Sequence, residues 1–273
     1  MKNKSLILFT VLICSVNIHA QGLYGKIGGS LGFGWPWTYS SNESYHELEM
    51  TLTGTEVTSK NSNFGFGADP FIAVGYMFTP TMGAEIGFGN HFGIARTNEN
   101  SYINPLTRQS YRADVKIKCS WMWINPQLVI ATTVSDFNPY AKVGVVIGFS
   151  PKMEMLSENL SDKGHRKTEV SGGMPWGFNA TLGISKQLKN NFHLFGELEM
   201  VQMNYAPTIS EITEYTDANG TDQLPLLNQK SKKTEFVDGW NSSDLSNDLP
   251  NKVAKINVPL SSLKINLGIR YNF

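Results

Sequence analysis

The last eleven residues of the chain alternate strictly between apolar and polar side chains. The odd positions hold Leu263, Ile265, Leu267, Ile269, Tyr271 and Phe273, and the even positions hold Lys264, Asn266, Gly268, Arg270 and Asn272. A β-strand places successive side chains on opposite faces, whereas a helix would spread both sets around its axis. This segment is therefore predicted to be a β-strand with one apolar and one polar face.

The same alternation recurs along the chain and predicts eight strands. They lie near residues 23–34, 69–78, 82–93, 113–130, 139–149, 176–188, 192–205 and 260–273. Pro126 lies inside the fourth segment, and a bulge or strand break is predicted there because proline cannot donate to a strand ladder.

The connections between these strands alternate between long and short. The long ones cover residues 35–68, 94–112, 150–175 and 206–259, and the short ones cover residues 79–81, 131–138 and 189–191. Transmembrane barrels have this asymmetry, with short periplasmic turns and long extracellular loops, whereas a soluble sandwich has no reason for it. The prediction is an all-β fold, an eight-stranded antiparallel up-and-down transmembrane β-barrel. Ten strands are the alternative if 206–259 adds a hairpin, and Ile256–Val258 is expected to join the last strand.

The first twenty residues have the features of a secretory signal. Lys2 and Lys4 precede an apolar stretch, Leu6–Val16, which is shorter than the roughly 20 residues of a membrane-spanning helix. We expect a signal peptide at 1–20, cleaved after Ala20, and one barrel domain at 21–273; a buried N-terminal helix is the alternative. Cys119 would then be the only cysteine of the mature chain, which excludes an intramolecular disulfide.

Aromatic residues cluster near both predicted ends of the strands, as expected where rings meet the headgroup layers of a bilayer. Those near the outer ends are Trp35, Trp37, Phe92, Phe149, Trp176 and Tyr205, and those near the inner ends are Tyr76, Phe78, Phe192, Tyr271 and Phe273. Two such belts are predicted to flank the membrane-embedded band of the barrel.

With these features the chain resembles the small outer-membrane β-barrel proteins, the group that contains the transmembrane domain of outer-membrane protein A and single-domain barrels abundant in Bacteroidetes. The motif that carries the likeness is the end of the chain, where Ile269, Tyr271 and Phe273 look like the signal that the barrel assembly machinery recognises. The resemblance implies the outer membrane of a Gram-negative bacterium, contact with outer-membrane lipid and lipopolysaccharide, and no cofactor. No periplasmic peptidoglycan-binding domain follows the last strand, so cell-wall anchoring is not implied.

Strand parity predicts a charged lumen. The inward set is expected to be Lys26, Glu85, Lys116, Lys118, Lys142, Glu197, Glu199, Lys264 and Arg270. An eight-stranded barrel is just wide enough for side chains to fill its interior, and buried charges are costly unless paired. A mixed-sign network that plugs the lumen is the main expectation. The surplus of cations leaves a narrow, anion-biased path open as the alternative.

No catalytic, metal or cofactor site is predicted. His91 and Asp114 are expected to point inward near the extracellular rim, with Ser110 or Ser120 nearby, but no G-x-S-x-G elbow accompanies them. The glycines lack the Lys-Ser/Thr partner of a phosphate loop, and the acidic loops lack a calcium-binding pattern.

The balance of 23 basic and 23 acidic residues removes the electrostatic case for binding nucleic acid. The expected function is that of a non-enzymatic envelope protein, structural or interacting with an extracellular ligand through its loops. A narrow porin-like channel or small-molecule transporter is the first alternative, and a lipid-modifying enzyme is the second.

Overall fold

The computed structural model describes residues 22–34, 45–51, 54–60, 64–103, 110–132, 137–159, 164–239 and 246–273. The predicted signal peptide, together with Trp35 and Trp37, lies outside these residues. No helix in the described part of the chain is long and apolar enough to cross a membrane.

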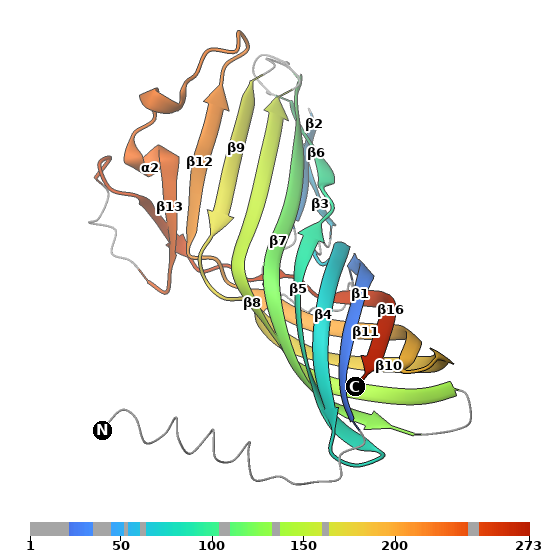
Figure 1. Cartoon of the computed structure of the whole chain (residues 1–273). Coiled ribbons are helices and arrows are strands. Elements are labelled where there is room, and N and C mark those ends of the chain that lie inside the picture. Colours follow the sequence, from blue (N-terminus) through green and yellow to red (C-terminus); the bar gives the residue numbers. More distant parts are fainter. Residues whose placement is uncertain are drawn as a thin grey trace, which may run out of the picture.

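Eight strands form a closed antiparallel barrel (Figure 1). In ring order they are β1 (Gly22–Gly34), β4 (Gly67–Met77), β5 (Met82–Gly93), β7 (Ser110–Ala131), β8 (Phe137–Asn159), β10 (Trp176–Lys189), β11 (Phe192–Tyr205) and β16 (Ser262–Asn272). The ring closes where β16 pairs with β1, from Tyr24 opposite Asn272 to Gly34 opposite Ser262. The predicted eight-stranded barrel is confirmed.

The two longest strands, β7 and β8, continue beyond the barrel and form a second structure there, which we name the wing sheet. Its other strands are β2 (Tyr45–Thr51), β3 (Gly54–Lys60), β6 (Arg96–Ile103), β9 (His165–Ser171), β12 (Ile209–Thr216), β13 (Lys233–Val237) and β14 (Asn251–Ala254). The spatial order is β3-β2-β6-β7-β8-β9-β12-β13-β14, and the sheet rises from the barrel on the side of the long loops (Figure 1).

The segment 206–259 therefore adds strands to the wing sheet rather than to the barrel, and the ten-stranded alternative is wrong. Between β12 and β13 it also forms two short helices, η1 (Leu224–Leu226) and α2 (Gln229–Lys232). The expected extension of the last strand over Ile256–Val258 is replaced by a separate short strand, β15 (Val258–Pro259), which pairs with β11.

The predicted bulge or strand break at Pro126 is present only as a gap in one ladder: the pairing of β7 with β8 passes from Ile124 opposite Ile147 to Gln127 opposite Gly144 without a register shift. Pro126 lies opposite Ile86 within continuous pairing of β7 with β5, because a proline removes only one ladder donor. The register of β7 against β8 shifts instead between Ser120 and Met122, close to Ser150, whose φ is +47°. A bulge bends a strand, and this one lies where β7 and β8 leave the barrel for the wing sheet.

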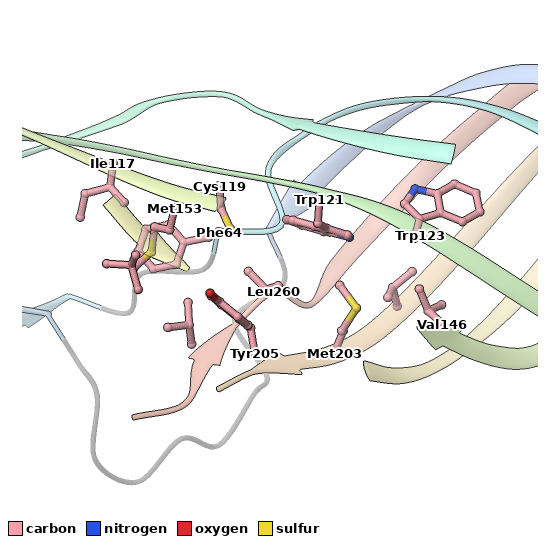
Figure 2. Packing of buried hydrophobic residues seen from close by; sticks show 13 residues of the cluster. Phe64, Ile117, Cys119, Trp121, Trp123, Val146, Met153, Met203, Tyr205 and Leu260 are labelled. Atoms are coloured by element: carbon pink, nitrogen blue, oxygen red, sulfur yellow. The ribbon is translucent and has the colours of Figure 1, made fainter. Parts of the chain in front are cut away.

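The mouth of the barrel at the long-loop end is filled by a cluster of buried apolar side chains, which we name the mouth cluster (Figure 2). It joins Trp121 on β7, Met203 and Tyr205 on β11, and Leu260 and Phe64 from the segments that cross the opening. Backbone hydrogen bonds hold these crossings, from the Leu260 N–H to the Met203 carbonyl at 2.9 Å and from the Phe64 N–H to the Pro259 carbonyl at 3.1 Å. Tyr205 is fully buried here, so its predicted place in the outer aromatic belt is wrong.

Candidate functional site

The centre of the lumen holds four ionised side chains in mutual contact. Lys26 Nζ lies 2.6 Å from Glu197 Oε1 and 3.2 Å from Glu85 Oε2, and Lys142 Nζ lies 2.9 Å from a carboxylate oxygen of each glutamate. All four residues are about 5 % exposed. Two cations and two anions alternate in this group, which we name the central ion network, so its charge is neutral and each ion is compensated.

Two tyrosines complete the hydrogen bonding of this network, and each lies over a glycine of the neighbouring strand. The Tyr24 hydroxyl donates to Glu85 at 2.9 Å, and the Tyr140 hydroxyl donates to Glu197 at 2.7 Å. Tyr24 is paired with Gly75 and Tyr140 with Gly183, and a Cβ at either glycine would overlap the tyrosine ring. These glycines are required because the rings occupy the space of their missing side chains.

A second buried group lies closer to the mouth and is centred on Asp69, which is fully buried. Its carboxylate oxygens lie 2.9 Å from His91 Nδ1 and 3.0 Å from Lys264 Nζ. The Ser30 hydroxyl donates to it at 3.0 Å, and the Trp123 indole N–H donates at 3.4 Å. The His91 ring stacks on Trp121 of the mouth cluster, with the ring centroids 3.8 Å apart. Asp69 thus connects four strands to the apolar mouth.

The remaining predicted lumen residues, Glu199 and Arg270, border the central ion network, and each shares a partner with it: Asn266, which also donates to Glu197 at 3.1 Å, and Tyr24, which also donates to Glu85. Glu199 accepts hydrogen bonds from the side-chain amides of Asn179 at 2.8 Å and Asn266 at 3.0 Å. The Arg270 guanidinium lies 3.9 Å from the centroid of the Tyr24 ring. Glu199 extends the polar lining toward the wing sheet, and Arg270 extends it toward the short-turn end of the barrel.

Two of the nine residues predicted to face the lumen do not. Lys116 and Lys118 lie on the part of β7 that belongs to the wing sheet, with side chains 43 % and 53 % exposed, where they pair with Glu158 and Glu154. The buried positions on this strand are the odd ones, such as Ile117 and Cys119, so period-two alternation turns the even-numbered lysines outward.

Asp69, Tyr24 and Tyr140 were not identified from the sequence as members of the site. The alternation of faces along β4 could have identified Asp69 as a lumen residue, because Asp69 lies on the same face as the buried Ala73 and Met77. With Asp69 included, the lumen of the described barrel holds four cationic residues (Lys26, Lys142, Lys264 and Arg270) and four carboxylates (Asp69, Glu85, Glu197 and Glu199). The cation surplus expected from the sequence is absent from this set.

The histidine considered for catalysis has a different partner from the one expected. His91 bonds to Asp69, whereas Asp114 lies on the wing part of β7, opposite Glu158 of β8. Within the described parts of the chain, no group of three or more His, Cys, Asp or Glu side chains is placed to hold a metal ion.

A small cavity lies inside the lumen. The cavity between the two buried groups has a volume of about 20 Å³ and is bordered by Ser30, Asn125, Glu199 and Asn266, among others. That is room for about one water molecule. The side-chain oxygens of Asn125 and Asn266 are buried there without a protein partner, and such groups are usually satisfied by ordered water.

The outside of the barrel is apolar. Ile27, Leu182 and Leu267 are 64 %, 68 % and 62 % exposed, on three different strands. Aromatic side chains are exposed near both ends of the strands, with Phe92, Phe149 and Trp176 at the long-loop end and Phe78, Phe192, Tyr271 and Phe273 at the short-turn end. A water-soluble protein rarely exposes a contiguous apolar surface of this extent, whereas a bilayer requires one.

A barrel wall embedded in lipid is expected to be destabilised by a charged substitution, whereas a charged substitution in the exposed segments around the wing sheet is expected to have little effect. Leu182→Arg, at the middle of β10, is expected to lower the free energy of unfolding in lipid vesicles by about 2–4 kcal/mol. Leu226→Arg, at the last residue of η1, where the side chain is 78 % exposed, is the matched control and is expected to have no measurable effect. Denaturant titrations in vesicles measure both, and equal effects of the two substitutions would contradict an embedded wall.

No protein-family model matches the sequence, and no curated protein shows significant similarity to it. Among solved structures, the crystal structure of Neisserial surface protein A is 11 % identical with a TM-score of 0.40, covering 93 % of this chain and 99 % of that one. The crystal structure of the outer membrane protein OprG from Pseudomonas aeruginosa is 12 % identical with a TM-score of 0.43, covering 93 % and 97 %. Likenesses of this size do not establish a shared function.

The chain's own geometry decides the class of protein. Eight strands close into one antiparallel ring, the interior is polar and charged, and the exterior is an apolar band with aromatic side chains at both ends. Closed barrels are the form in which strands cross a bilayer, because a closed ring leaves no unpaired strand edge in lipid. The chain therefore has the architecture of a small eight-stranded transmembrane β-barrel.

Proposed function

We propose that this protein is a non-enzymatic barrel of the bacterial outer membrane whose role is to hold the wing sheet at the cell surface, for structural or recognition purposes. The observation that carries this proposal is the length of β7 and β8, which contain 22 and 23 residues. About 9–11 residues suffice for a transmembrane strand. The first half of β7 and the second half of β8 therefore extend beyond the bilayer as a continuous part of the wall.

The wing sheet carries an ordered pattern of charge on the face that continues the outside of the barrel. Lys118 Nζ lies 2.6 Å from Glu154, and Lys152 Nζ lies 3.0 Å from Glu169 of β9. Lys167 of β9 lies 3.5 Å from Glu214 of β12. These cross-strand pairs support a rigid, polar surface, and recognition is commonly carried by segments that a rigid scaffold positions.

The interior favours this role over conduction. The central ion network and the group around Asp69 fill the lumen, the mouth cluster covers it, and the cavity of about 20 Å³ has room for about one water molecule. The eight barrel strands are paired all the way around the ring, which disfavours a lateral exit for a small molecule. The partners that we propose are outer-membrane lipid and lipopolysaccharide around the wall, the barrel assembly machinery during insertion, and an extracellular ligand on the wing sheet.

Two measurements test the proposal. A membrane-impermeant amine reagent applied to intact cells is expected to label Lys118 and Lys152, which are about half exposed, and to leave Lys26 and Lys142 unmodified because they are buried in the lumen. Purified protein in planar bilayers is expected to show no conductance steps above the bilayer baseline. Labelled lumen lysines together with regular steps would instead favour the channel, and unlabelled wing lysines would contradict the surface location.

A further inference from the structure

The charges of the lumen balance in number but not in position. The central ion network is neutral, and Lys264 is compensated by Asp69 at 3.0 Å, which leaves the carboxylate of Glu199 and the guanidinium of Arg270. Lys264 is the β16 residue opposite Glu199, and Arg270 lies six residues further along the same strand. Six residues of a β-strand span about 20 Å, and the Arg270 guanidinium lies 3.9 Å from the centroid of the Tyr24 ring. Arg270 therefore does not compensate Glu199.

Glu199 is a buried carboxylate whose hydrogen-bond partners in the described structure are neutral. The residue is 9 % exposed. The side-chain amide of Asn179 donates to its Oε1 at 2.8 Å, and that of Asn266 donates to its Oε2 at 3.0 Å. These hydrogen bonds orient the carboxylate but do not remove its charge. An ionised carboxylate away from water is costly unless a cation accompanies it.

The cavity of about 20 Å³ lies against this carboxylate, and Asn125 and Asn266 line it as well. The side-chain oxygens of these two asparagines are buried without a protein partner, and the residues are 5 % and 3 % exposed. The orientation of the Asn266 amide is fixed, because its nitrogen donates to both Glu197 and Glu199. One anionic group and two neutral oxygens therefore border a space of the size of one water molecule or one small ion.

We propose that this cavity binds one dehydrated alkali-metal cation, Na⁺ or K⁺. The proposed ligands are the carboxylate of Glu199, the side-chain oxygens of Asn125 and Asn266, and the hydroxyl oxygen of Ser30, whose hydrogen is donated to Asp69. A water molecule in this place satisfies the two amide oxygens but leaves the charge of Glu199 uncompensated, whereas a monovalent cation does both. Oxygen dipoles that replace the hydration shell are a known way of holding alkali ions.

The ligand set favours a monovalent ion over other metals. Glu85, Glu197 and Lys142 also line the cavity, but they compensate one another within the central ion network, so Glu199 is the carboxylate left for the ion. Ca²⁺ takes about six to eight oxygen ligands, and Mg²⁺ keeps several waters, for which a cavity of about 20 Å³ has no room. Transition metals favour His and Cys ligands, and no metal-binding group of such side chains occurs within the described ranges.

Urea titrations of the protein in lipid vesicles test the proposal, because a ligand that binds only the folded state stabilises it. They are run in mixtures of NaCl or KCl with choline chloride at constant total salt, since choline is too large for the cavity. The unfolding equilibrium constant of the wild type is expected to fall roughly tenfold for each tenfold rise in Na⁺ or K⁺ above the dissociation constant. The two salts show which alkali ion fits better.

Glu199→Gln removes the charge and nearly keeps the shape. The Asn179 side-chain oxygen has no partner, so this amide can turn to accept from the new glutamine. The variant is expected to lose the dependence on Na⁺ and K⁺, and in choline chloride alone to be at least as stable as the wild type, because no carboxylate then lacks a counter-ion. Glu154→Gln, on the wing sheet, is the matched control and is expected to keep the dependence.

Asn125→Ala is the second variant, and it keeps the test decisive if Glu199→Gln prevents folding. It removes one proposed ligand without touching the hydrogen bonds of Glu199, and it is expected to raise the Na⁺ or K⁺ concentration needed for stabilisation roughly tenfold. Equal wild-type stability in NaCl, KCl and choline chloride overturns the proposal, as does an unchanged alkali dependence in Glu199→Gln or Asn125→Ala. A stabilisation by CaCl₂ without one by NaCl or KCl also overturns it. The proposed role of the wing sheet stands in each of these cases.

Discussion

Replacing Glu197 with alanine is expected to lower the free energy of unfolding by about 3–5 kcal/mol, the usual effect of breaking a buried ion pair. Glu197 accepts from Lys26 at 2.6 Å, from Lys142 at 2.9 Å and from the Tyr140 hydroxyl at 2.7 Å. Without it, two buried ammonium groups share Glu85 as the carboxylate of the central ion network. One positive charge is then uncompensated in a lumen with little room for water.

The measurement is a urea titration of the protein in lipid vesicles, followed by tryptophan fluorescence. Glu154→Ala is the matched control, because Glu154 also accepts from a lysine at 2.6 Å, but that lysine is 53 % exposed on the wing sheet. Surface pairs contribute about 0–1 kcal/mol. The double variant Glu197→Gln with Lys142→Met restores charge balance and is expected to recover part of the loss. Equal losses for Glu197→Ala and Glu154→Ala would show that the network is not effectively buried.

Replacing Asp69 with alanine is expected to have an effect of similar size, about 3–5 kcal/mol, for the same physical reason. The carboxylate lies 3.0 Å from Lys264 Nζ and 2.9 Å from His91 Nδ1. It is the carboxylate that the described structure places against Lys264, whose side chain is 8 % exposed. Its removal leaves that ammonium buried without a counter-ion beneath the mouth cluster.

Two further variants separate charge from hydrogen bonding at this position. Ser30→Ala removes one hydroxyl donor to Asp69 and is expected to cost about 0.5–1.5 kcal/mol. Asp69→Asn keeps a polar group of the same shape but leaves Lys264 uncompensated, and it is expected to behave like Asp69→Ala. The same urea titration measures all three. A cost for Asp69→Asn as small as that for Ser30→Ala would contradict a role for the charge.

Local alternation was sufficient to locate the barrel strands. The predicted strand 82–93 coincides with β5 (Met82–Gly93) and 192–205 with β11 (Phe192–Tyr205). A transmembrane strand faces lipid on one side and a polar lumen on the other, so apolar and polar side chains alternate along its sequence. The members of the central ion network could be selected on this basis, because each lies on the polar face of such a strand.

Assigning the charged face of a strand to the lumen failed where the environment of that strand changes along its length. Lys116 and Lys118 belong to the same continuous strand as Trp123. Beyond the mouth, however, neither face of β7 borders lipid or the lumen. Charge then indicates a solvent-exposed face rather than the lumen. Tyr205 was misplaced for the converse reason, because an aromatic side chain at a strand end can pack beneath crossing loops as well as against headgroups.

The sequence alone determined which residues form the wall and which way most of them face, because these depend on neighbours one and two positions apart. The tertiary structure decided which inward residues meet. Glu197 finds Lys26 only because β1 and β11, 171 residues apart at these positions, both pair with β16. The tilt and register of closed strands set these contacts, and no local pattern encodes them. The wing sheet likewise depends on long-range pairing of loop segments with β7 and β8.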